Sequence, residues 1–329
     1  MSEFHPPARR QYQVRASVRE EVKKKQEVKA DLSYKPWNFD VRIPLQSLAE
    51  EGRLLLFPKI SRVTVGMATC GRAAGALAIQ QSLSARQDGP DAANVVSVGC
   101  LGACYAEPLV DVRMPDGRHY FYGRADQRSL WSIISKSQGK PPSHHLWAVA
   151  KERKNGVLSS IHDMELVNAY DSGFKEFFDF QTRRISGRCG LINPQDIKEY
   201  AAAGGYQALE RSLFRCRPEK IIELIKASGL RGRGGAGFLT GVKWDITASA
   251  KDLIRFVVAN ADEGDPGAYM DRALLESDPH SVLEGLIIAA YAVGASQAYI
   301  FVRHEYPLAV HTLREAIKSA RRVGILGPN

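Results

Sequence analysis

The sequence contains few cysteines and no long hydrophobic run. Its five cysteines are an odd and sparse number among 329 residues, and no signal-peptide pattern precedes them. We therefore expect no disulfide framework and a reducing compartment, the cytoplasm. The longest apolar stretch, 286–293, is far shorter than the roughly 20 residues of a transmembrane helix, so we expect no membrane span.

The chain also lacks any recognisable nucleic-acid-binding module, although its net charge is +9. Basic side chains gather in the first thirty residues, where glutamates interrupt them, which favours a solvated segment over a polyanion-binding arm. We therefore expect no nucleic-acid partner. The length predicts two domains with an appended tail.

The stretch 229–244 is unusually rich in glycine and cations. It reads Gly-Leu-Arg-Gly-Arg-Gly-Gly-Ala-Gly-Phe-Leu-Thr-Gly-Val-Lys-Trp. Glycine lets backbone N–H groups approach a ligand, and successive N–H groups form an anion-binding concavity. A flexible linker is the alternative, but linkers rarely mix Arg, Phe and Trp with glycine. The stretch therefore predicts a site for a phosphate-bearing cofactor.

A second, acidic loop follows the apolar run 253–259, which we interpret as a buried strand. The loop begins Asn-Ala-Asp-Glu-Gly-Asp-Pro-Gly at residue 260. Ligands in open α/β sheets bind beyond the carboxyl ends of strands. Carboxylates there accept hydrogen bonds from ribose hydroxyls or flavin N–H groups but repel phosphate. The two loops are therefore expected to bind different parts of one ligand.

Taken together, the two loops resemble the NADH-binding flavoprotein subunit of respiratory complex I, a subunit type that also serves soluble NAD-linked hydrogenases and formate dehydrogenases. One glycine-rich loop would be a weak signal, but two long motifs in register are specific. The resemblance implies FMN and NAD(H) as cofactors, and other subunits of an electron-transfer complex as partners. It implies no catalytic side chain, because the hydride passes from NADH to FMN.

The resemblance also implies roles for individual residues. The glycine amides, Arg233 and Lys243 would hold the FMN phosphate and ring, and Phe238 would stack on NADH. Leu239 replaces the family's usual proline, and Ile246 stands where an aromatic often completes the stacking clamp, so the choice between NADH and NADPH stays open. The cofactor-binding residues implied are Gly232, Arg233, Gly234, Gly235, Gly237, Phe238, Lys243, Asn260, Asp262, Glu263 and Asp265.

Three cysteines upstream have a spacing that suits iron. Cys100 and Cys104 follow the strand-like run 94–98, and two thiolates four apart on a glycine-containing turn can share one iron. Cys70 precedes a predicted helix, 73–84, whose N-terminus favours a thiolate. This order resembles the thioredoxin-like [2Fe–2S] ferredoxin domain that family members often carry. The resemblance implies Cys70, Cys100 and Cys104 as metal ligands.

The ligand set departs from the family's pattern. Such a cluster normally takes four cysteines, and Val65 and Gly66 stand where the partner of Cys70 belongs. Three interpretations follow. The cluster is lost and the fold is kept for docking, or a non-cysteine or distant ligand completes the cluster. The third is that Cys189 or Cys216 supplies the fourth ligand, but both lie in the next domain, which argues against this.

We therefore expect an α/β protein with a thioredoxin-like α/β domain followed by an α/β FMN-binding flavoprotein domain. The expected boundaries are a basic extension over 1–58, the [2Fe–2S] ferredoxin-type domain over 59–138 and the flavoprotein domain over 139–329. In the family the flavin domain continues into a [4Fe–4S] region that is not encoded here, so we expect the flavoprotein domain to be C-terminally incomplete.

Three functional hypotheses follow. The first is an NADH dehydrogenase (diaphorase) module that transfers a hydride from NADH to FMN and single electrons onward to Fe–S clusters. The alternative is a non-catalytic assembly subunit or incomplete paralogue that needs another chain. The third is a nucleotide-binding regulator without redox chemistry. In each case we expect a cytoplasmic protein, associated with a membrane at most through partner subunits.

Overall fold

The computed structural model describes residues 42–85, 93–126, 145–153, 158–170, 172–252, 254–265 and 267–327. These residues fall within one compact unit, Asp40–Asn329. Residues 1–41 of the expected basic extension lie outside the described residues. Residues 127–144 also lie outside them, and they hold the end of the expected ferredoxin-type domain and most of the segment that links it to the flavoprotein domain. The expected domain boundaries stay predictions.

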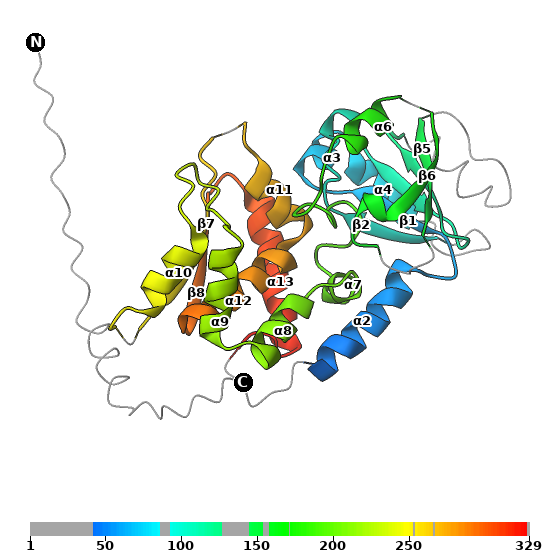
Figure 1. The fold of residues 1–329 in the computed structure, drawn as a ribbon. Coiled ribbons are helices and arrows are strands. Elements are labelled where there is room, and N and C mark those ends of the chain that lie inside the picture. The colour runs from blue at the N-terminus through cyan, green and yellow to red at the C-terminus, as the bar shows by residue number, and fades with distance from the viewer. Residues whose placement is uncertain are drawn as a thin grey trace, which may run out of the picture. The chain divides into compact units, whose positions relative to one another are not determined.

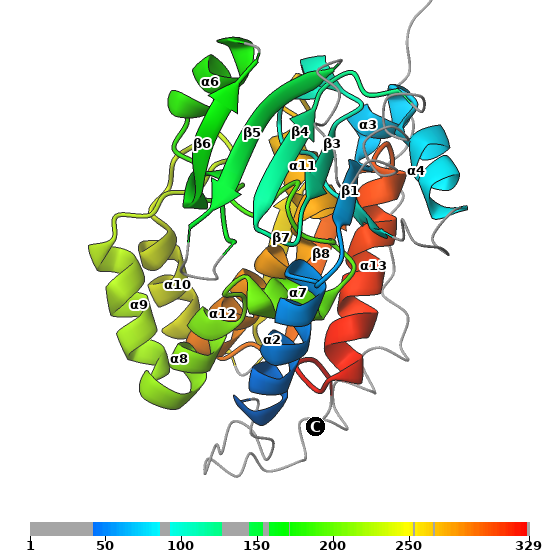
Figure 2. The same ribbon diagram turned by 90° about the vertical axis from the view of Figure 1, so that its right-hand side faces the viewer.

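Six strands of the first half form one mixed sheet in the order β2-β1-β3-β4-β5-β6 (Figure 2). β1 and β2 are parallel, and every other neighbouring pair is antiparallel. The sheet thus continues past residue 138 through β5 and β6. Its elements are β1 (Arg62–Gly66), α3 (Thr69–Ala73), α4 (Ala76–Ser84), β2 (Asn94–Val98), η1 (Cys104–Ala106), β3 (Val110–Arg113), β4 (Arg118–Tyr122), β5 (Leu146–Glu152), η2 (Ile161–Asp163), β6 (Met164–Ala169) and α6 (Ser172–Asp179).

Both faces of this sheet are covered by apolar side chains. Val63 and Tyr122 belong to the core under α4. On the other face Trp147 of β5 meets Phe174 of α6 edge-on, with ring centroids 5.1 Å apart. β1 is therefore buried along its whole length, as a central strand rich in β-branched residues should be.

The second half is mainly helical, with a two-stranded parallel sheet of β7 and β8 (Figure 1). In the described parts of the chain, no helix is both long and apolar enough to cross a membrane. The elements are α7 (Ile197–Ala202), α8 (Gln207–Arg215), α9 (Pro218–Ala227), α10 (Thr240–Ala248), β7 (Phe256–Ala261), α11 (Met270–Ser277), α12 (Pro279–Val293), β8 (Gln297–Val302) and α13 (Pro307–Arg322).

Most elements expected in this half are confirmed. The sequence predicts helices over 218–228 and 307–322, a helix with Asp278 as N-cap through the apolar run 282–293, and a strand over 298–302. The structure has these as α9, α13, α12 and β8. Gly229, at φ +65°, ends α9 in the left-handed conformation typical of this position. In the first half, the single helix expected at 73–84 is instead α3 and α4, because Gly75 lies between them at φ +97°.

The strand expected to be buried at 253–259 is β7, and the expectation of burial is wrong. Phe256 and Val258 expose about half of their surface, 49% and 58%. In the described residues the sheet has two strands, and its other face packs against α12 and α13. Tyr299 and Phe301 of β8 continue the exposed face, which therefore forms an apolar surface of four side chains.

Helix α2 (Arg42–Leu56) and β1 are both tied to α7. Gly52 of α2 lies so close that an added Cβ would be 1.9 Å from the Lys198 carbonyl oxygen. Arg62 at the start of β1 donates to Glu199 at 2.7 Å, and both side chains are almost fully buried. Breaking a buried ion pair leaves an uncompensated charge in the protein interior, which is costly. This contact therefore fixes α7 against the sheet.

His119 of β4 links three strands through its ring. Nδ1 lies 2.7 Å from Asp111 Oδ2 on β3, and Nε2 lies 3.1 Å from Glu152 Oε1 on β5. Burial by itself lowers the pKa of His119, but the two carboxylates outweigh it and raise the pKa to about 9. The folded chain therefore holds a proton that the unfolded chain releases near pH 6.5.

We predict that this proton makes stability pH-dependent. Because the folded pKa is raised, the contribution is fully present below about pH 6.5 and is lost as the pH rises through 9, with up to about 3 kcal/mol of unfolding free energy at stake. Urea unfolding at several pH values should show this decline, and His119→Gln should flatten it. An equally steep decline in the variant would contradict the prediction.

Candidate functional site

The glycine-rich stretch forms an exposed, hairpin-like loop between α9 and α10. An isolated antiparallel bridge joins Arg231 to Leu239, and the Gly232 N–H donates to the Phe238 carbonyl at 2.8 Å. The Arg231 guanidinium donates to the Gly237 carbonyl at 2.8 Å. These contacts close the base of the loop and leave its tip projecting.

Open space surrounds the glycines at the tip of this loop. A Cβ added to Gly234, Gly235 or Gly237 would meet no heavy atom within 4 Å. Gly235 and Gly237 have φ values of +101° and +63°, which favour glycine. Backbone conformation, and not crowding, therefore requires glycine at these two positions, and the tip is accessible to a ligand.

Two cations and an aromatic ring accompany the loop. Arg233 and Lys243 are exposed, and neither forms an ion pair within the described residues. Lys243 Nζ lies 6.0 Å from the centroid of the Phe238 ring, which is 49% exposed. The three side chains thus offer two uncompensated charges and one aromatic face.

The acidic loop after β7 extends beyond the same end of the two-stranded sheet as the glycine-rich loop in Figure 1. Asn260, Asp262 and Asp265 are exposed. Asn260 Oδ1 accepts from the Asp262 N–H at 2.9 Å, and Asp265 Oδ1 accepts from the Gly267 N–H at 3.2 Å. Among the described residues no hydrogen bond or ion pair joins the two loops, so the exposed carboxylates stay accessible.

Glu263 differs from its neighbours because its carboxylate is buried and engaged. Its oxygens accept from the N–H groups of Asp271 and Arg272 at the start of α11, at 3.0 and 3.3 Å. The Tyr306 hydroxyl donates to Glu263 at 3.2 Å. In this arrangement Glu263 fixes the acidic loop to α11 and α13, and flavin binding by its side chain stays a prediction.

The three cysteines expected to bind metal line one cavity of about 350 Å³. Cys100 Sγ lies 3.6 Å from Cys104 Sγ. Two thiolates about 2.3 Å from one tetrahedral metal would be roughly 3.8 Å apart, so this pair fits. The Cys70 thiol, at the start of α3, interacts with Cys104. Within the described ranges, no three His, Cys, Asp or Glu side chains are placed to hold a single metal ion.

Cys189 lines the same cavity, so its place in the expected next domain does not keep it away from the other three cysteines. The Ser277 hydroxyl accepts from the Cys100 N–H at 2.9 Å and also interacts with the Cys189 thiol. A Cβ on Gly190 would lie 2.8 Å from the Leu101 Cα. The chain after α6 therefore returns to the Cys100–Cys104 turn, which sequence spacing could not reveal.

Glu107, which the sequence motifs did not single out, lies beside the Cys70 segment, since a Cβ built on Gly71 would be 3.2 Å from its Oε2. It lies three residues after Cys104, before Pro108, and is 8% exposed. Glu107 Oε2 accepts from the Leu109 N–H at 2.7 Å, whereas Oε1 has no hydrogen-bond partner among the described residues. The signal in the sequence was an acidic residue beside the Cys-x-x-x-Cys turn.

Burial and mutual contact raise the pKa of several of these groups. Burial raises the pKa of Glu107 to about 7, that of Cys70 to about 11 and that of Cys189 to about 12. The contact with Cys100, followed by burial, raises the pKa of Cys104. A metal that binds here must therefore displace protons.

The junction of α11 and α12 holds the cavity together through consecutive buried residues. Glu276 accepts from the N–H and the hydroxyl of Thr69 at 2.8 and 2.6 Å. Asp278 occupies the expected N-cap position of α12, but its side chain makes no cap bond and accepts from Arg188 Nε at 2.9 Å instead. A Cβ on Gly99 would lie 2.2 Å from the Cβ of Ser277.

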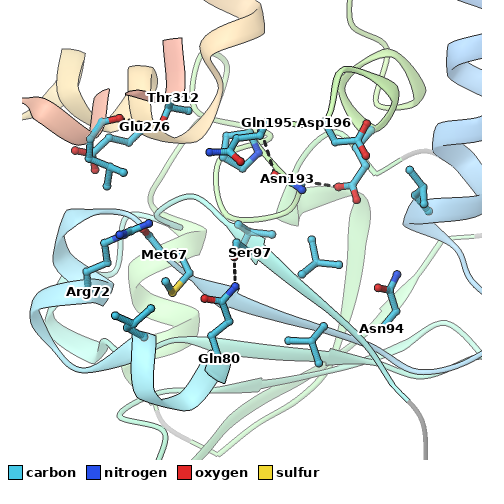
Figure 3. Close-up of a pocket in the computed structure, with 18 residues that line it drawn as sticks. Met67, Arg72, Gln80, Asn94, Ser97, Asn193, Gln195, Asp196, Glu276 and Thr312 are labelled. Atoms are coloured by element: carbon cyan, nitrogen blue, oxygen red, sulfur yellow. Dashed lines mark hydrogen bonds between the residues drawn. The ribbon is translucent and has the colours of Figure 1, made fainter. Parts of the chain in front are cut away.

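A second cavity of about 520 Å³ borders α4, β2 and α13 (Figure 3). Gln80 donates to Ser97 on its wall. Its buried carboxylates are already engaged, since Glu276 binds Thr69 and Glu199 binds Arg62. We assign this cavity no ligand.

The glycine-rich hairpin and the Asn-Ala-Asp-Glu-Gly loop lie in the part of the chain that comparison identifies as a flavin-binding domain. Residues 225–326 match the family model described as the Nuo51 FMN-binding domain. In the first half β1 and β2 are parallel, and β3 and β4 are antiparallel. The expected α/β fold class is confirmed, and the match of residues 225–326 places the FMN-binding family region in the second half.

Particular relatives sharpen this class. The NADP-reducing hydrogenase subunit HndC of Solidesulfovibrio fructosivorans is 49% identical over 149 residues, which cover 45% of this chain and 30% of that protein. An NADH-quinone oxidoreductase subunit of Aquifex aeolicus is 50% identical over 133 residues, covering 40% and 31%. A solved thioredoxin-like [2Fe-2S] ferredoxin from Aquifex aeolicus is 21% identical, with a TM-score of 0.23, and covers 27% of this chain and 95% of that one. The chain thus spans about a third of the length of these curated relatives.

We predict that Gly190→Ala destabilises the protein more than Gly204→Ala does. Both glycines have left-handed φ values, +83° and +86°, so both variants carry about 1–2 kcal/mol of backbone strain. At Gly190 the new methyl also meets the Leu101 backbone, whereas at Gly204 the nearest atom is 3.9 Å away. Urea unfolding should show an extra loss of about 1–3 kcal/mol for Gly190→Ala. Equal losses would contradict the packing of this segment on the Cys100–Cys104 turn.

Proposed function

We propose that this chain is an NADH dehydrogenase (diaphorase) module of a multisubunit, cytoplasmic oxidoreductase. In this proposal NADH reduces FMN, and single electrons pass onward to Fe–S clusters. The observation that carries it is the exposed glycine-rich loop, with its two uncompensated cations, inside the segment that matches the FMN-binding family. The relatives, which are subunits of a hydrogenase and of NADH-quinone oxidoreductases, support the same class.

The residues of the two loops fit FMN and a nicotinamide nucleotide. Bound FMN would supply an acceptor that takes two electrons and releases them singly. The open glycine tip, Arg233 and Lys243 would bind its phosphate, since backbone N–H groups and full charges both favour an anion. Phe238, half exposed beside Lys243, would orient NADH by stacking. Asn260 and Asp262 would accept from flavin N–H groups, and Asp265 would lie near the nucleotide.

The thiol-lined cavity fits a [2Fe–2S] cluster as the next electron carrier. Cys100 and Cys104 have the separation of two ligands on one iron, and Cys70 lies beside them. Glu276 and Ser277 belong to the family-matched segment and bind Thr69 and Cys100 directly. The flavin domain would therefore be held rigidly against the cluster-binding turns, as electron transfer between fixed centres requires.

We predict that Lys243→Ala weakens FMN binding by about tenfold or more, because a charge-assisted contact to phosphate is lost. Lys251→Ala, which removes an equally exposed lysine outside the loop, is the matched control and should leave the affinity unchanged. Flavin fluorescence quenching gives the dissociation constant, and NADH–ferricyanide activity at saturating FMN reports turnover. Equal FMN affinities for the two variants would contradict the assignment of Lys243 to phosphate binding.

The alternative function, a non-catalytic assembly subunit that needs another chain, is favoured by one observation. The exposed apolar face of β7 and β8 offers a second protein a surface to cover. NADH–ferricyanide activity of the purified chain separates the two functions. Activity of the purified chain by itself supports the proposed module, and activity that arises only when a second chain is added supports the alternative. A colourless chain that takes up no FMN would overturn the proposal.

A further inference from the structure

Four cysteines line the cavity, but the motifs of the proposed cluster supply three of them, Cys70, Cys100 and Cys104. Cys100 and Cys104 form one close pair, and Cys70 has no cysteine partner on its own side of the turn. The family's spacing would place that partner at residue 65 or 66. In this chain Gly66 ends β1 and has no side chain.

The carboxylate of Glu107 fills the place that a side chain at Gly66 would occupy. A Cβ built on Gly66 would lie 3.2 Å from Glu107 Oε2 and 3.3 Å from Oε1. A Cβ on Gly71, the residue after Cys70, would also lie 3.2 Å from Oε2. Glu107 therefore reaches from the Cys104 turn across to the segment that carries Cys70.

One oxygen of this carboxylate is available for a ligand. Leu109 donates to Oε2, whereas Oε1 is fully buried and has no hydrogen-bond partner among the described residues. A buried, unpaired carboxylate oxygen is costly, so a native protein that keeps one commonly uses it.

We propose that Glu107 is the fourth ligand of the [2Fe–2S] cluster, sharing one iron with Cys70 while Cys100 and Cys104 hold the other. This inference rests on the cluster of the proposed function. A carboxylate carries the same single negative charge as the thiolate it replaces, so the total charge of the ligand set is unchanged. Oxygen is a harder ligand than sulfur, and ligand identity is one of the factors that set the potential and spectrum of such a cluster.

Cys189 is the competing fourth ligand, and its surroundings argue against it. Its thiol interacts with the Ser277 hydroxyl, and its charge partners are Asp278, Arg183 and Arg188. Cys189 thus interacts with residues of the α11–α12 junction, whereas the Glu107 carboxylate lies against Gly71, the residue after Cys70.

The test compares variants of the full chain after reconstitution with iron and sulfide. Glu107→Gln keeps the shape of the side chain and an acceptor for the Leu109 N–H but removes the charge. We expect it to lower the affinity for iron by about tenfold or more. The double variant Gly66→Cys with Glu107→Ala places a thiol where the carboxylate lay. We expect it to restore the iron content, with stronger visible absorption and changed EPR g values in the reduced state.

Cys189→Ser and Cys216→Ser are the matched controls, and both should bind iron as the wild type does. Iron and acid-labile sulfide per chain, the EPR spectrum and the FMN content are measured on each sample, and urea unfolding confirms that each variant folds. Retention of the wild-type iron content and spectrum by Glu107→Gln would overturn the proposal, and so would loss of iron in Cys189→Ser.

The same measurements separate this inference from the proposed function. A wild-type chain that binds FMN but no iron would overturn the cluster and Glu107 together, and leave the flavin site standing. A wild-type chain with iron but no FMN would overturn the NADH-oxidising module, while the effects of the Glu107 variants would still decide the ligand.

Discussion

The whole described structure depends on three consecutive buried side chains at the junction of α11 and α12. Glu276, Ser277 and Asp278 each bind a different segment near the thiol-lined cavity: the start of α3, the Cys100 turn and the Arg188 segment. The three side chains are buried, and leaving a buried polar group without its hydrogen bond costs about 1–3 kcal/mol of folding free energy. Separating the α11–α12 junction from these three segments would leave all three side chains unpaired, so the constraint acts as a unit.

Local signals in the sequence predicted the elements of this molecule well. Pro218 and Gly229 bracket α9, and Pro307 begins α13, because proline and glycine act through their own backbone geometry. The glycine-rich loop was recognisable for the same reason, since glycine at Gly235 and Gly237 answers a local conformational need. The family match over 225–326 bears out the kind of domain that these motifs indicated.

Tertiary placement could not be predicted in the same way. Cys189 lies far from Cys104 in the sequence, and the chain between them passes through strands β3 to β6 and helix α6 before it returns to the cavity. Glu263 belongs to a recognisable motif, yet its carboxylate is taken up by the α11 amides. β7 has the composition of a buried strand but exposes one face, since burial depends on what covers a strand as well as on its residues.

The contact between Gly99 and Ser277 also bears on how the two regions can change over time. A side chain at residue 99 would collide with the backbone and Cβ of Ser277, and Ser277 in turn holds the Cys100 turn. A larger residue at either position is tolerable only with a compensating change at the other. Residue 99 and the helix junction that it touches therefore restrict each other's side chains. Exchanging the region around residue 99 for the equivalent region of a relative would succeed only where the donor also carries glycine at this position.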